Sequence, residues 1–498
     1  MHLKYDIIII GAGIVGSLTA RFLSRYNLDI LLIEKESDIC TGATGGNSAL
    51  IHGGYDAVPG SLKAKTNVRG NAMWDQLSAE LQFPFDRRGT YVVAIGEEEL
   101  PILEELHQRG AASGIPVEII SGVEMRRREP RINPETSGAL YCPSGGICDP
   151  WAATIAAAEN AVQNGVELRL KTQFRDFIWA DAAQHEQIIG IKTNQGDFYA
   201  RWIVNAAGLY ADEVMHRAGV RPEFTIIPRR GEYYVLDRAD VEINNVLFPV
   251  PTEISKGILV TATTHGNPLV GPNAQEIDDK SNVDVTPAGM AEIWQGAQKL
   301  VPSLTRRNIV AVFAGLRPGG NAPCQGCDVA YNKDFIIEIP TEVHGLVNLG
   351  GIESPGLTAA PAIAERVGEL LQAAGEELPI KATWNPIRPA RPVFRHLSHQ
   401  EQAALVATDP RYGRVICRCE NVTEGEIVAA IHAPIPATTY DAIKRRTWLG
   451  TGRCLGAFDT PRVVEILARE LGKDPPEISK KNGGSEFLTR KTKEAPHE

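Results

Sequence analysis

Three glycines and one acid near the start of the chain have the types and spacing that bind a dinucleotide. Gly11, Gly13 and Gly16 follow an apolar, β-branched run, and Glu34 stands 18 residues after Gly16. Gly11 permits a tight turn, Gly13 lets a pyrophosphate approach the backbone, and Gly16 lets the next helix pack closely. The N-terminus of that helix offers N–H groups to phosphate, and the acid suits ribose hydroxyls. A glycine turn of some other α/β protein would leave Glu34 unexplained, so we predict dinucleotide binding.

Cysteines form a second set of residues that could do chemistry. Cys417 and Cys419 stand two apart, Cys454 follows far along the chain, and Cys324 and Cys327 form a CxxC pair. Eight cysteines in 498 residues are no disulfide framework. The CxxC pair could be a redox dithiol, half of a metal site, or a reduced loop pair without a role. The residues alone leave these three alternatives open.

The glycine turn needs a strand before it and a helix after it. Apolar periodicity predicts a strand over 5–10, a helix over 17–26 and a strand over 30–33. The stretch 41–56, rich in Gly, Ser and Asn, indicates backbone that passes close to a ligand. Further helices are predicted over 62–82, 97–109, 151–164 and 359–374, and further strands over 91–95, 166–170 and 202–205.

The domain organisation follows from a change of pattern in the middle of the chain. Residues 220–340 hold short runs of alternating polarity, which predict a mostly antiparallel sheet inserted into an α/β nucleotide-binding domain. A proline-rich stretch then indicates a boundary. The predicted divisions are a first domain over 1–377 (nucleotide-binding parts 1–85, 145–215 and 340–377; substrate parts about 86–144 and 216–339), a linker over 378–408, a small domain over 409–475, and a polar tail over 476–498.

Composition limits the function classes. The net charge of −10 argues against general nucleic-acid binding. The N-terminus runs straight into a core strand, so no signal peptide is expected. No apolar run reaches the ~18 residues of a membrane span. We expect a cytoplasmic protein, at most peripheral to the inner face of the membrane.

Four motifs resemble those of the FAD-dependent oxidoreductases of the D-amino-acid-oxidase superfamily, over roughly residues 5–375. They are 11–16 with Glu34, Asn47-Ser48 with 52–54, Asn-Ala-Ala-Gly at 205–208, and Gly-Gly-Ile-Glu-Ser-Pro-Gly-Leu-Thr at 350–358. Within that superfamily the segments 228–234 and 315–318 look most like the glycerol-3-phosphate dehydrogenase/oxidase branch, with the L-2-hydroxyglutarate oxidase branch nearby.

The resemblance implies FAD rather than NAD. The segment 350–358 opens a helix, and a helix N-terminus stabilises negative charge on a reduced flavin. An NAD enzyme, the alternative, would have no use for a second cofactor-facing segment more than 300 residues beyond the first. The implied cofactor-binding residues are Gly11, Gly13, Gly16, Glu34, Lys35, Thr44, Asn47, Ser48, Ala207, Gly208, Gly351, Gly356, Leu357 and Thr358.

Oxidising a secondary alcohol with a flavin needs a base for the hydroxyl proton and a cationic clamp for an anionic substrate. His52 can serve as the base, or it can simply hydrogen-bond FAD. Arg317 can pair with phosphate or carboxylate, or it can be a surface arginine. The resemblance places Lys256 where the glycerol-3-phosphate oxidases hold a substrate lysine, and Ser354 completes the candidate set.

The last cysteines resemble those of the BFD-like [2Fe–2S] domains, which use Cys-x-Cys and then Cys-x4-Cys. Cys417, Cys419 and Cys454 match, but the fourth position is Asp459. In one interpretation the Asp459 carboxylate is the fourth ligand and alters the potential. In the other the cluster is lost and the domain persists as a docking module. A zinc site is a third option.

Together these features favour an FAD-dependent enzyme that oxidises glycerol 3-phosphate, a small anionic alcohol, to dihydroxyacetone phosphate. Electrons would leave through any cluster to a quinone or a protein acceptor, or to dioxygen if no cluster is present. Oxidation of a 2-hydroxy acid such as L-2-hydroxyglutarate, or of an amine, is the first alternative. A non-catalytic flavin/iron–sulfur electron-transfer subunit is the second.

Overall fold

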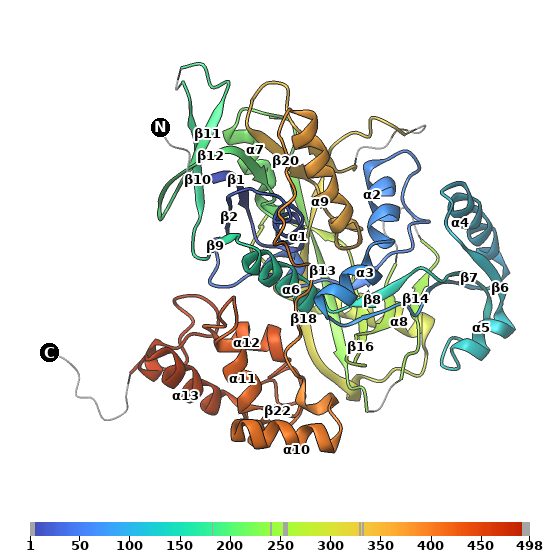
Figure 1. Ribbon diagram of the computed structural model, residues 1–498. Helices are drawn as coiled ribbons and strands as arrows, with labels where there is room; N and C mark the ends of the chain where they lie inside the picture. The colour runs from blue at the N-terminus through green and yellow to red at the C-terminus, as the bar shows by residue number, and fades with distance from the viewer. Residues whose placement is uncertain are drawn as a thin grey trace.

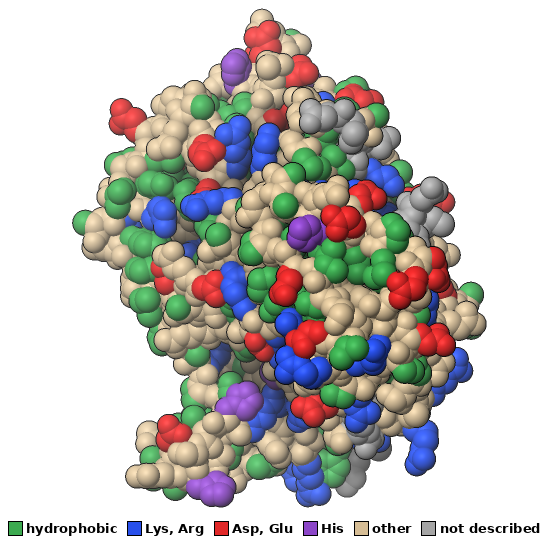
Figure 2. Space-filling view, turned by 90° about the vertical axis from the view of Figure 1, so that its right-hand side faces the viewer, with side chains coloured by type: hydrophobic (Ala, Val, Ile, Leu, Met, Phe, Trp, Pro, Cys, Tyr) green, Lys and Arg blue, Asp and Glu red, His purple; other side chains and the backbone are tan. Residues whose placement is uncertain are grey.

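The structure, a computed structural model, describes residues 5–181, 183–239, 242–251, 257–327, 330 and 333–490. It confirms the predicted α/β fold with an inserted sheet and a helical C-terminal domain (Figure 1). The predicted domain boundaries themselves stay a prediction. In the described part of the chain, every helix is too short or too polar to cross a membrane. The face seen in Figure 2 mixes acidic, basic and apolar side chains.

The first sheet is built around five parallel strands, in the order β9, β2, β1, β12, β20. The central strand β1 is almost entirely buried, because its run of isoleucines has helices on one side and other apolar side chains on the other. An antiparallel strand, β19, borders β20, and β10 and β11 pair with the first half of β12. The bounds are β1 Tyr5–Ile10, β2 Ile30–Ile33, β9 Glu167–Arg169, β10 Phe174–Trp179, β11 Ile188–Thr193, β12 Gly196–Asn205, β19 Ile336–Glu338 and β20 Leu346–Gly350.

Three helices cover one face of this sheet. Helix α1 (Ile14–Leu23) packs between α6 (Pro150–Gln163) and α9 (Gly356–Ala373), as Figure 1 shows. Helix α1 begins three residues earlier than predicted, because Gly13 already occupies the N-cap position. The start of α9, like that of α1, therefore lies at the carboxyl end of the parallel strands, where ligands bind in such folds.

The helix predicted over 62–82 is wrong as a single helix. The structure has α2 (Leu62–Asn71) and α3 (Trp74–Leu81) instead. Gly70 packs directly on the backbone of Thr358, so closely that a Cβ would collide with the Thr358 carbonyl. The bend then lets the Trp74 indole donate to the same carbonyl at 3.1 Å. Contact with the start of α9 thus breaks the helix, and that contact is not visible in local periodicity.

The second sheet forms the substrate domain, in the order β17, β13, β16, β15, β14, β5, β7, β6, with β18 paired along most of β13. All neighbours are antiparallel except β14 and β5. The strand bounds are β5 Thr90–Ile95, β6 Glu118–Ser121, β7 Thr136–Cys142, β13 Ile226–Leu236, β14 Val246–Pro249, β15 Leu259–Ala262, β16 Pro268–Gly271, β17 Gln275–Glu276 and β18 Ile309–Gly320. The helices beside it are α4 Leu100–Ala112, α5 Gly122–Arg128 and α8 Pro287–Leu300, and α7 Ala211–Arg217 follows β12, where the chain leaves the first sheet. A small sheet of β3 Leu50–Ile51, β8 Gly146–Cys148 and β4 Phe85–Asp86 joins the two parts.

The C-terminal domain has a core of its own, formed by the apolar faces of its helices. Its elements are α10 His399–Thr408, β21 Val415–Cys417, β22 Val422–Thr423, α11 Glu424–Ile431, α12 Tyr440–Thr447 and α13 Thr460–Leu471. It docks on the first domain beside α6 (Figure 1). The fully buried Asp38 accepts hydrogen bonds from Arg445 and Arg446 of α12 at 2.6–3.0 Å. The predicted polar tail also packs here, since Ser37 donates to Asn482 at 3.0 Å.

Candidate active site and cysteine site

The glycine turn between β1 and α1 has the backbone that the sequence predicted. Gly11 has φ of +103°, and a Cβ there would lie 2.6 Å from the carbonyl oxygen of Ala206. A Cβ on Gly16 would overlap the Gly11 carbonyl. Gly13 caps α1 without a side chain, which leaves the first N–H groups of the helix facing the turn. Residues Ala206 to Gly208, at the end of β12, close the turn from the neighbouring strand.

Glu34 lies at the end of β2 and is tied to this turn. Its carboxylate accepts N–H groups from Ala12 at 2.9 Å and from Glu36 at 3.1 Å. Burial raises the pKa of the Glu34 carboxyl. The Lys35 ammonium lies 3.8 Å from the centre of the Tyr210 ring, just after Ala207 and Gly208. Acid, lysine and glycine turn therefore lie on one edge of the sheet.

The segment from Thr44 to His52 connects the starts of α1 and α9. It begins in a short 3-10 helix, η1 (Ala43–Gly45), where the Thr44 hydroxyl accepts the N–H of Ile14 at 3.1 Å. The Asn47 side chain braces the turn, donating to the Thr44 carbonyl at 2.8 Å and accepting from Ala49 at 2.7 Å. The segment is thus held by its own hydrogen bonds against the two helix N-termini.

His52 and Ser354 meet at the start of α9. The two side chains are 3.3 Å apart, Nε2 to Oγ, and the His52 N–H donates to the Thr358 hydroxyl at 2.9 Å. Gly351, with φ of +66°, follows the last residue of β20 and turns the chain toward Gly356, which begins the helix. A small cavity lined by His52, Gly53, Gly54 and Pro355, among others, holds about 10 Å³, the space of one water.

Arg317 lies in β18, close enough to Glu353 for the two charges to interact. Its Nη2 donates to the Asn273 carbonyl at 2.6 Å, and its Nε to the Arg229 carbonyl at 3.3 Å. Among the described residues, its Nη1 has no hydrogen-bond partner. Burial lowers the pKa of the Arg317 guanidinium, although an arginine stays charged in a protein. Two of its nitrogens are therefore anchored, and the third is available to an anion.

A buried ion network beside Ser354 was missed by the sequence reasoning. Glu353 pairs with Lys63 at 2.8 Å and with Arg229 at 3.3 Å. Burial raises the pKa of the Glu353 carboxyl, but the two cations outweigh burial and hold that pKa below its usual value. Glu353 belongs to a motif that the sequence singled out, whereas nothing in the sequence indicated its partners. The network gives the site a net excess of positive charge.

Tyr233 was also missed. Its hydroxyl lies 3.0 Å from the Ser48 hydroxyl, and its ring stacks on Phe313 with centroids 4.6 Å apart. Burial raises the pKa of the Tyr233 phenol, so it is a neutral donor at working pH. Tyr233 thus joins the cofactor-side segment to β13 and β18, which carry Arg229 and Arg317. The predicted substrate lysine, Lys256, lies outside the described residues.

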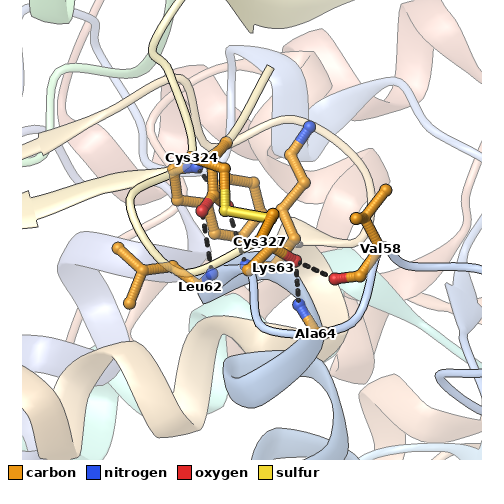
Figure 3. The surroundings of a disulfide bond; sticks show 9 residues. Val58, Leu62, Lys63, Ala64, Cys324 and Cys327 are labelled. Atoms are coloured by element: carbon orange, nitrogen blue, oxygen red, sulfur yellow. Dashed lines mark hydrogen bonds between the residues drawn. A yellow bond between two sulfur atoms is a disulfide. The ribbon is translucent and has the colours of Figure 1, made fainter. Parts of the chain in front are cut away.

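The CxxC pair is a disulfide between Cys324 and Cys327. Figure 3 shows it over the first turn of α2, next to Leu62 and Lys63. The N–H groups of these two residues donate to the Asp334 carboxylate at 2.9 and 3.0 Å. The two cysteines are therefore oxidised to a disulfide in this structure. Of the three alternatives, this agrees with a redox dithiol and differs from a reduced pair and from half of a metal site. The disulfide lies in the loop between β18 and β19, against the start of α2.

The four residues predicted as cluster ligands lie in two close pairs, Cys419 with Cys454 and Cys417 with Asp459, and do not converge on one centre. Cys419 and Cys454 have sulfurs 3.7 Å apart, and Cys419 is exposed. Cys417 is buried against Asp459, and burial together with that carboxyl raises the pKa of its thiol to about 12. Asp459 Oδ1 accepts the Tyr440 hydroxyl at 2.6 Å, and its buried Oδ2 has no hydrogen-bond partner among the residues that the structure describes.

The placement of these three cysteines and Asp459 can be compared with the ligand arrangement of known kinds of metal centre. In the described part of the chain, no three such side chains converge as ligands of one metal ion would. A [2Fe–2S] cluster, however, takes two protein ligands on each of two irons. Two pairs, one of thiols and one of a thiol with an unsatisfied carboxylate oxygen, fit that requirement. They do not fit a mononuclear zinc site, which needs its ligands around a single centre.

Comparison with known proteins identifies the family. Residues 6–370 match the model of the FAD dependent oxidoreductases, and residues 415–469 match that of the BFD-like [2Fe-2S] binding domain. The chain therefore belongs to the FAD dependent oxidoreductase family, as its motifs predicted, and FAD is its cofactor.

Relatives cover most of the molecule. The chain is 44% identical over 491 residues to a glycerol 3-phosphate dehydrogenase of Caloramator mitchellensis, covering 98% of this chain and 99% of that protein. It is 34% identical to a glycerol 3-phosphate oxidase of Mycoplasma pneumoniae, over 76% of this chain and 97% of that protein. The solved structure of the dithionite-reduced L-alpha-glycerophosphate oxidase from Mycoplasma pneumoniae with FAD bound is similar, with a TM-score of 0.72 and 33% identity, covering 79% of this chain and 100% of that chain.

Proposed function

We propose that this protein oxidises sn-glycerol 3-phosphate to dihydroxyacetone phosphate and passes the electrons through its cysteine site to a quinone or protein acceptor. The observation that carries the proposal is the pairing of His52 with Ser354 at the start of α9, across from the half-anchored Arg317. That arrangement offers a proton acceptor and an anion clamp in one site. Likeness to glycerol 3-phosphate enzymes over almost the whole chain supports the same substrate.

FAD, when bound, supplies the hydride acceptor. The residues that would hold it are those of the glycine turn, Glu34 at the ribose, and the 44–48 segment. The first N–H groups of α9 have no partners within the helix and face the same region. They would favour negative charge on the reduced flavin, because a helix N-terminus carries a partial positive charge.

The protein's own part in the reaction is to place the substrate and to move one proton. The free Nη1 of Arg317 would take the phosphate, and Lys256, if it reaches the site, would share that charge. The Nε2 of His52 would accept the proton of the C2 hydroxyl, while the Ser354 hydroxyl holds the ring in place. With the hydroxyl proton held by His52, the C2 hydrogen could pass as hydride to the bound acceptor, which would leave a carbonyl at C2.

Cys417, Cys419, Cys454 and Asp459 are the proposed ligands of a [2Fe–2S] cluster. The unsatisfied Asp459 oxygen beside Cys417 supports an oxygen ligand at the fourth position. An exposed Cys419 would put the cluster near the surface, within reach of an acceptor. Peripheral contact with the inner face of a membrane, where quinones reside, is part of the same proposal.

The test is an anaerobic titration of the purified flavoprotein with sn-glycerol 3-phosphate, L-2-hydroxyglutarate and glycine. We expect the flavin absorbance to bleach with glycerol 3-phosphate and not with the other two. Faster bleaching by L-2-hydroxyglutarate or glycine would mean that this compound, and not glycerol 3-phosphate, is the substrate. Absence of bleaching with all three, in protein that dithionite does reduce, would favour the non-catalytic subunit.

A further inference from the structure

A pair of stacked indoles crosses the contact between the two domains. Trp448 ends α12 in the C-terminal domain, and Trp151 lies in the first turn of α6. Their ring centroids are 5.1 Å apart, where Figure 1 places α12 beside α6. The Trp448 Nε1 donates to Asp149, the N-cap of α6, at 2.8 Å. The two rings are therefore fixed against each other.

On one side the pair reaches the flavin site. The Trp151 Nε1 donates to the carbonyl of Gly45 at 3.0 Å. Gly45 is the last residue of η1, whose Thr44 contacts the start of α1. This is the segment that joins the two helix N-termini facing FAD. One indole is thus one hydrogen bond away from the cofactor-binding backbone.

On the other side the pair reaches the cysteines. The N–H of Gly450, two residues after Trp448, lies close to the Cys417 sulfur. Gly452 packs so tightly on Cys419 that a Cβ would collide with it. Leu449, between Trp448 and Gly450, is fully buried in the domain core. The loop from Trp448 to Cys454 is therefore a short, packed connection from the indole to three sulfur atoms.

Three further side chains hold Trp448 in place: His265, Arg395 and Glu420. The His265 ring centroid lies 3.7 Å from that of Trp448, and Arg395 bonds His265 Nδ1 at 2.7 Å. Arg395 in turn pairs with Glu420 at 2.5 Å, next to Cys419. Both domains thus contribute side chains that hold the indole in place.

We propose that the stacked pair Trp151–Trp448 is the electron path between the flavin and the cysteine-held cluster. The proposal rests on the proposed function. Electron tunnelling decays less steeply through packed, bonded atoms than across a gap, and these two rings meet across the contact between the domains. The alcohol gives up two electrons and two protons. With both groups bound, the electrons would leave the flavin singly, each would reduce one ferric iron to ferrous, and an external one-electron acceptor would reoxidise the cluster before the second followed.

The experiment compares Trp448→Leu and Trp151→Leu with the wild type and with Trp384→Leu in the full-length protein. Trp384 is a matched control, because its indole packs on Arg21 and Arg25 and contacts no cysteine. Each protein is mixed anaerobically with sn-glycerol 3-phosphate. Flavin absorbance reports substrate oxidation, and freeze-quenched EPR reports the reduced cluster.

We expect unchanged flavin bleaching in all four proteins. The cluster signal should appear more slowly in the two test variants, since truncating either half-buried ring removes the atoms that bridge the two domains. Trp448→Phe, which keeps an aromatic ring, should recover most of the rate. The control should match the wild type.

Small-angle scattering of each apo protein shows whether the C-terminal domain is still docked. It therefore distinguishes a lost electron path from a lost domain contact. A docked domain with a slow cluster signal supports the proposal. If Trp448→Leu releases the domain, the proposal is judged on the rate of the cluster signal in Trp151→Leu and Trp448→Phe. A cluster signal at the wild-type rate in the docked test variants overturns the proposal. So does a wild type that bleaches with glycerol 3-phosphate but shows no cluster signal, a result that leaves the proposed oxidation standing.

Discussion

Removal of the Arg317 guanidinium tests the substrate clamp most directly. Its Nη2 and Nε are committed to the carbonyls of Asn273 and Arg229, so a substrate phosphate would bond to Nη1. A hydrogen bond to a charged group contributes about 1.5–3 kcal/mol. That corresponds to a loss of about 10- to 150-fold in kcat/KM for Arg317→Ala, at 1.36 kcal/mol for each factor of ten. Most of the loss should appear in KM, because the phosphate is held equally before and during hydride transfer.

The assay is steady-state oxidation with a dye acceptor, using sn-glycerol 3-phosphate and, separately, glycerol. Glycerol has the same secondary alcohol but no phosphate. Arg317→Ala should therefore lower the preference for glycerol 3-phosphate over glycerol by the same factor while leaving kcat/KM for glycerol almost unchanged. Arg317→Lys should recover only part of the preference, since an ammonium cannot reproduce the fork of the guanidinium.

The control is Arg307→Ala, which removes the same charge from an exposed position. Arg317 also satisfies backbone carbonyls, so each variant needs a melting curve beside its kinetics. An equal loss for both substrates would mean that the substitution disturbs the fold near the site. Unchanged kinetics for glycerol 3-phosphate in a folded Arg317→Ala protein would refute the clamp.

Three further predictions concern the base, the domain contact and the fourth ligand. His52→Gln should lower kcat by about 10²–10⁴-fold with FAD still bound, measured by single-turnover bleaching, because general-base catalysis contributes that much; a flavin-free variant would instead make His52 a cofactor-binding residue. Asp38→Asn should weaken docking by about 3–5 kcal/mol near neutral pH, since it leaves two guanidinium groups without a counter-charge. Burial raises the pKa of the Asp38 carboxyl, but Arg446 and Arg445 outweigh burial and lower that pKa below its usual value, so the wild-type advantage should be complete above about pH 4 and fade as the pH falls through the lowered pKa; melting curves from pH 7 to pH 3 that stay parallel would contradict this. Asp459→Cys should keep the cluster and shift its potential, read by EPR redox titration, because a thiolate replaces a harder oxygen ligand; an unshifted potential would remove Asp459 from the cluster.

The parts that the sequence predicted well are those that local chemistry decides. The strand before Gly11, the helix after Gly13 and the acid at the end of β2 each follow from a few consecutive residues, and the structure has all three. The single helix over 62–82 failed because Gly70 meets Thr358 across 288 positions of the chain. Local periodicity carries no information about such a contact.

The sequence did not predict Lys63 and Tyr233 as site residues for the same physical reason. Glu353 stood in a motif, but its buried partner Lys63 lies 290 residues away, and lysines are usually solvated. Tyr233 likewise gained its place only when β13 came to lie beside the segment holding Ser48. Partners that the fold alone brings together cannot be read from spacing, whereas a charged residue inside a glycine motif is a signal worth following.

The segment after β2 links the flavin site to the docking of the C-terminal domain. Glu34 binds the glycine turn, Asp38 binds Arg445 and Arg446, and the Cys40 N–H donates to the Ala12 carbonyl at 3.2 Å. FAD binding and domain docking must therefore order the same short stretch of backbone. Whichever occurs first bears the entropy of ordering that stretch, and the second does not. Because such coupling is reciprocal, FAD should strengthen docking by the same factor by which docking strengthens FAD binding. The cysteine site is then held beside the flavin most firmly in the state in which electrons can leave it.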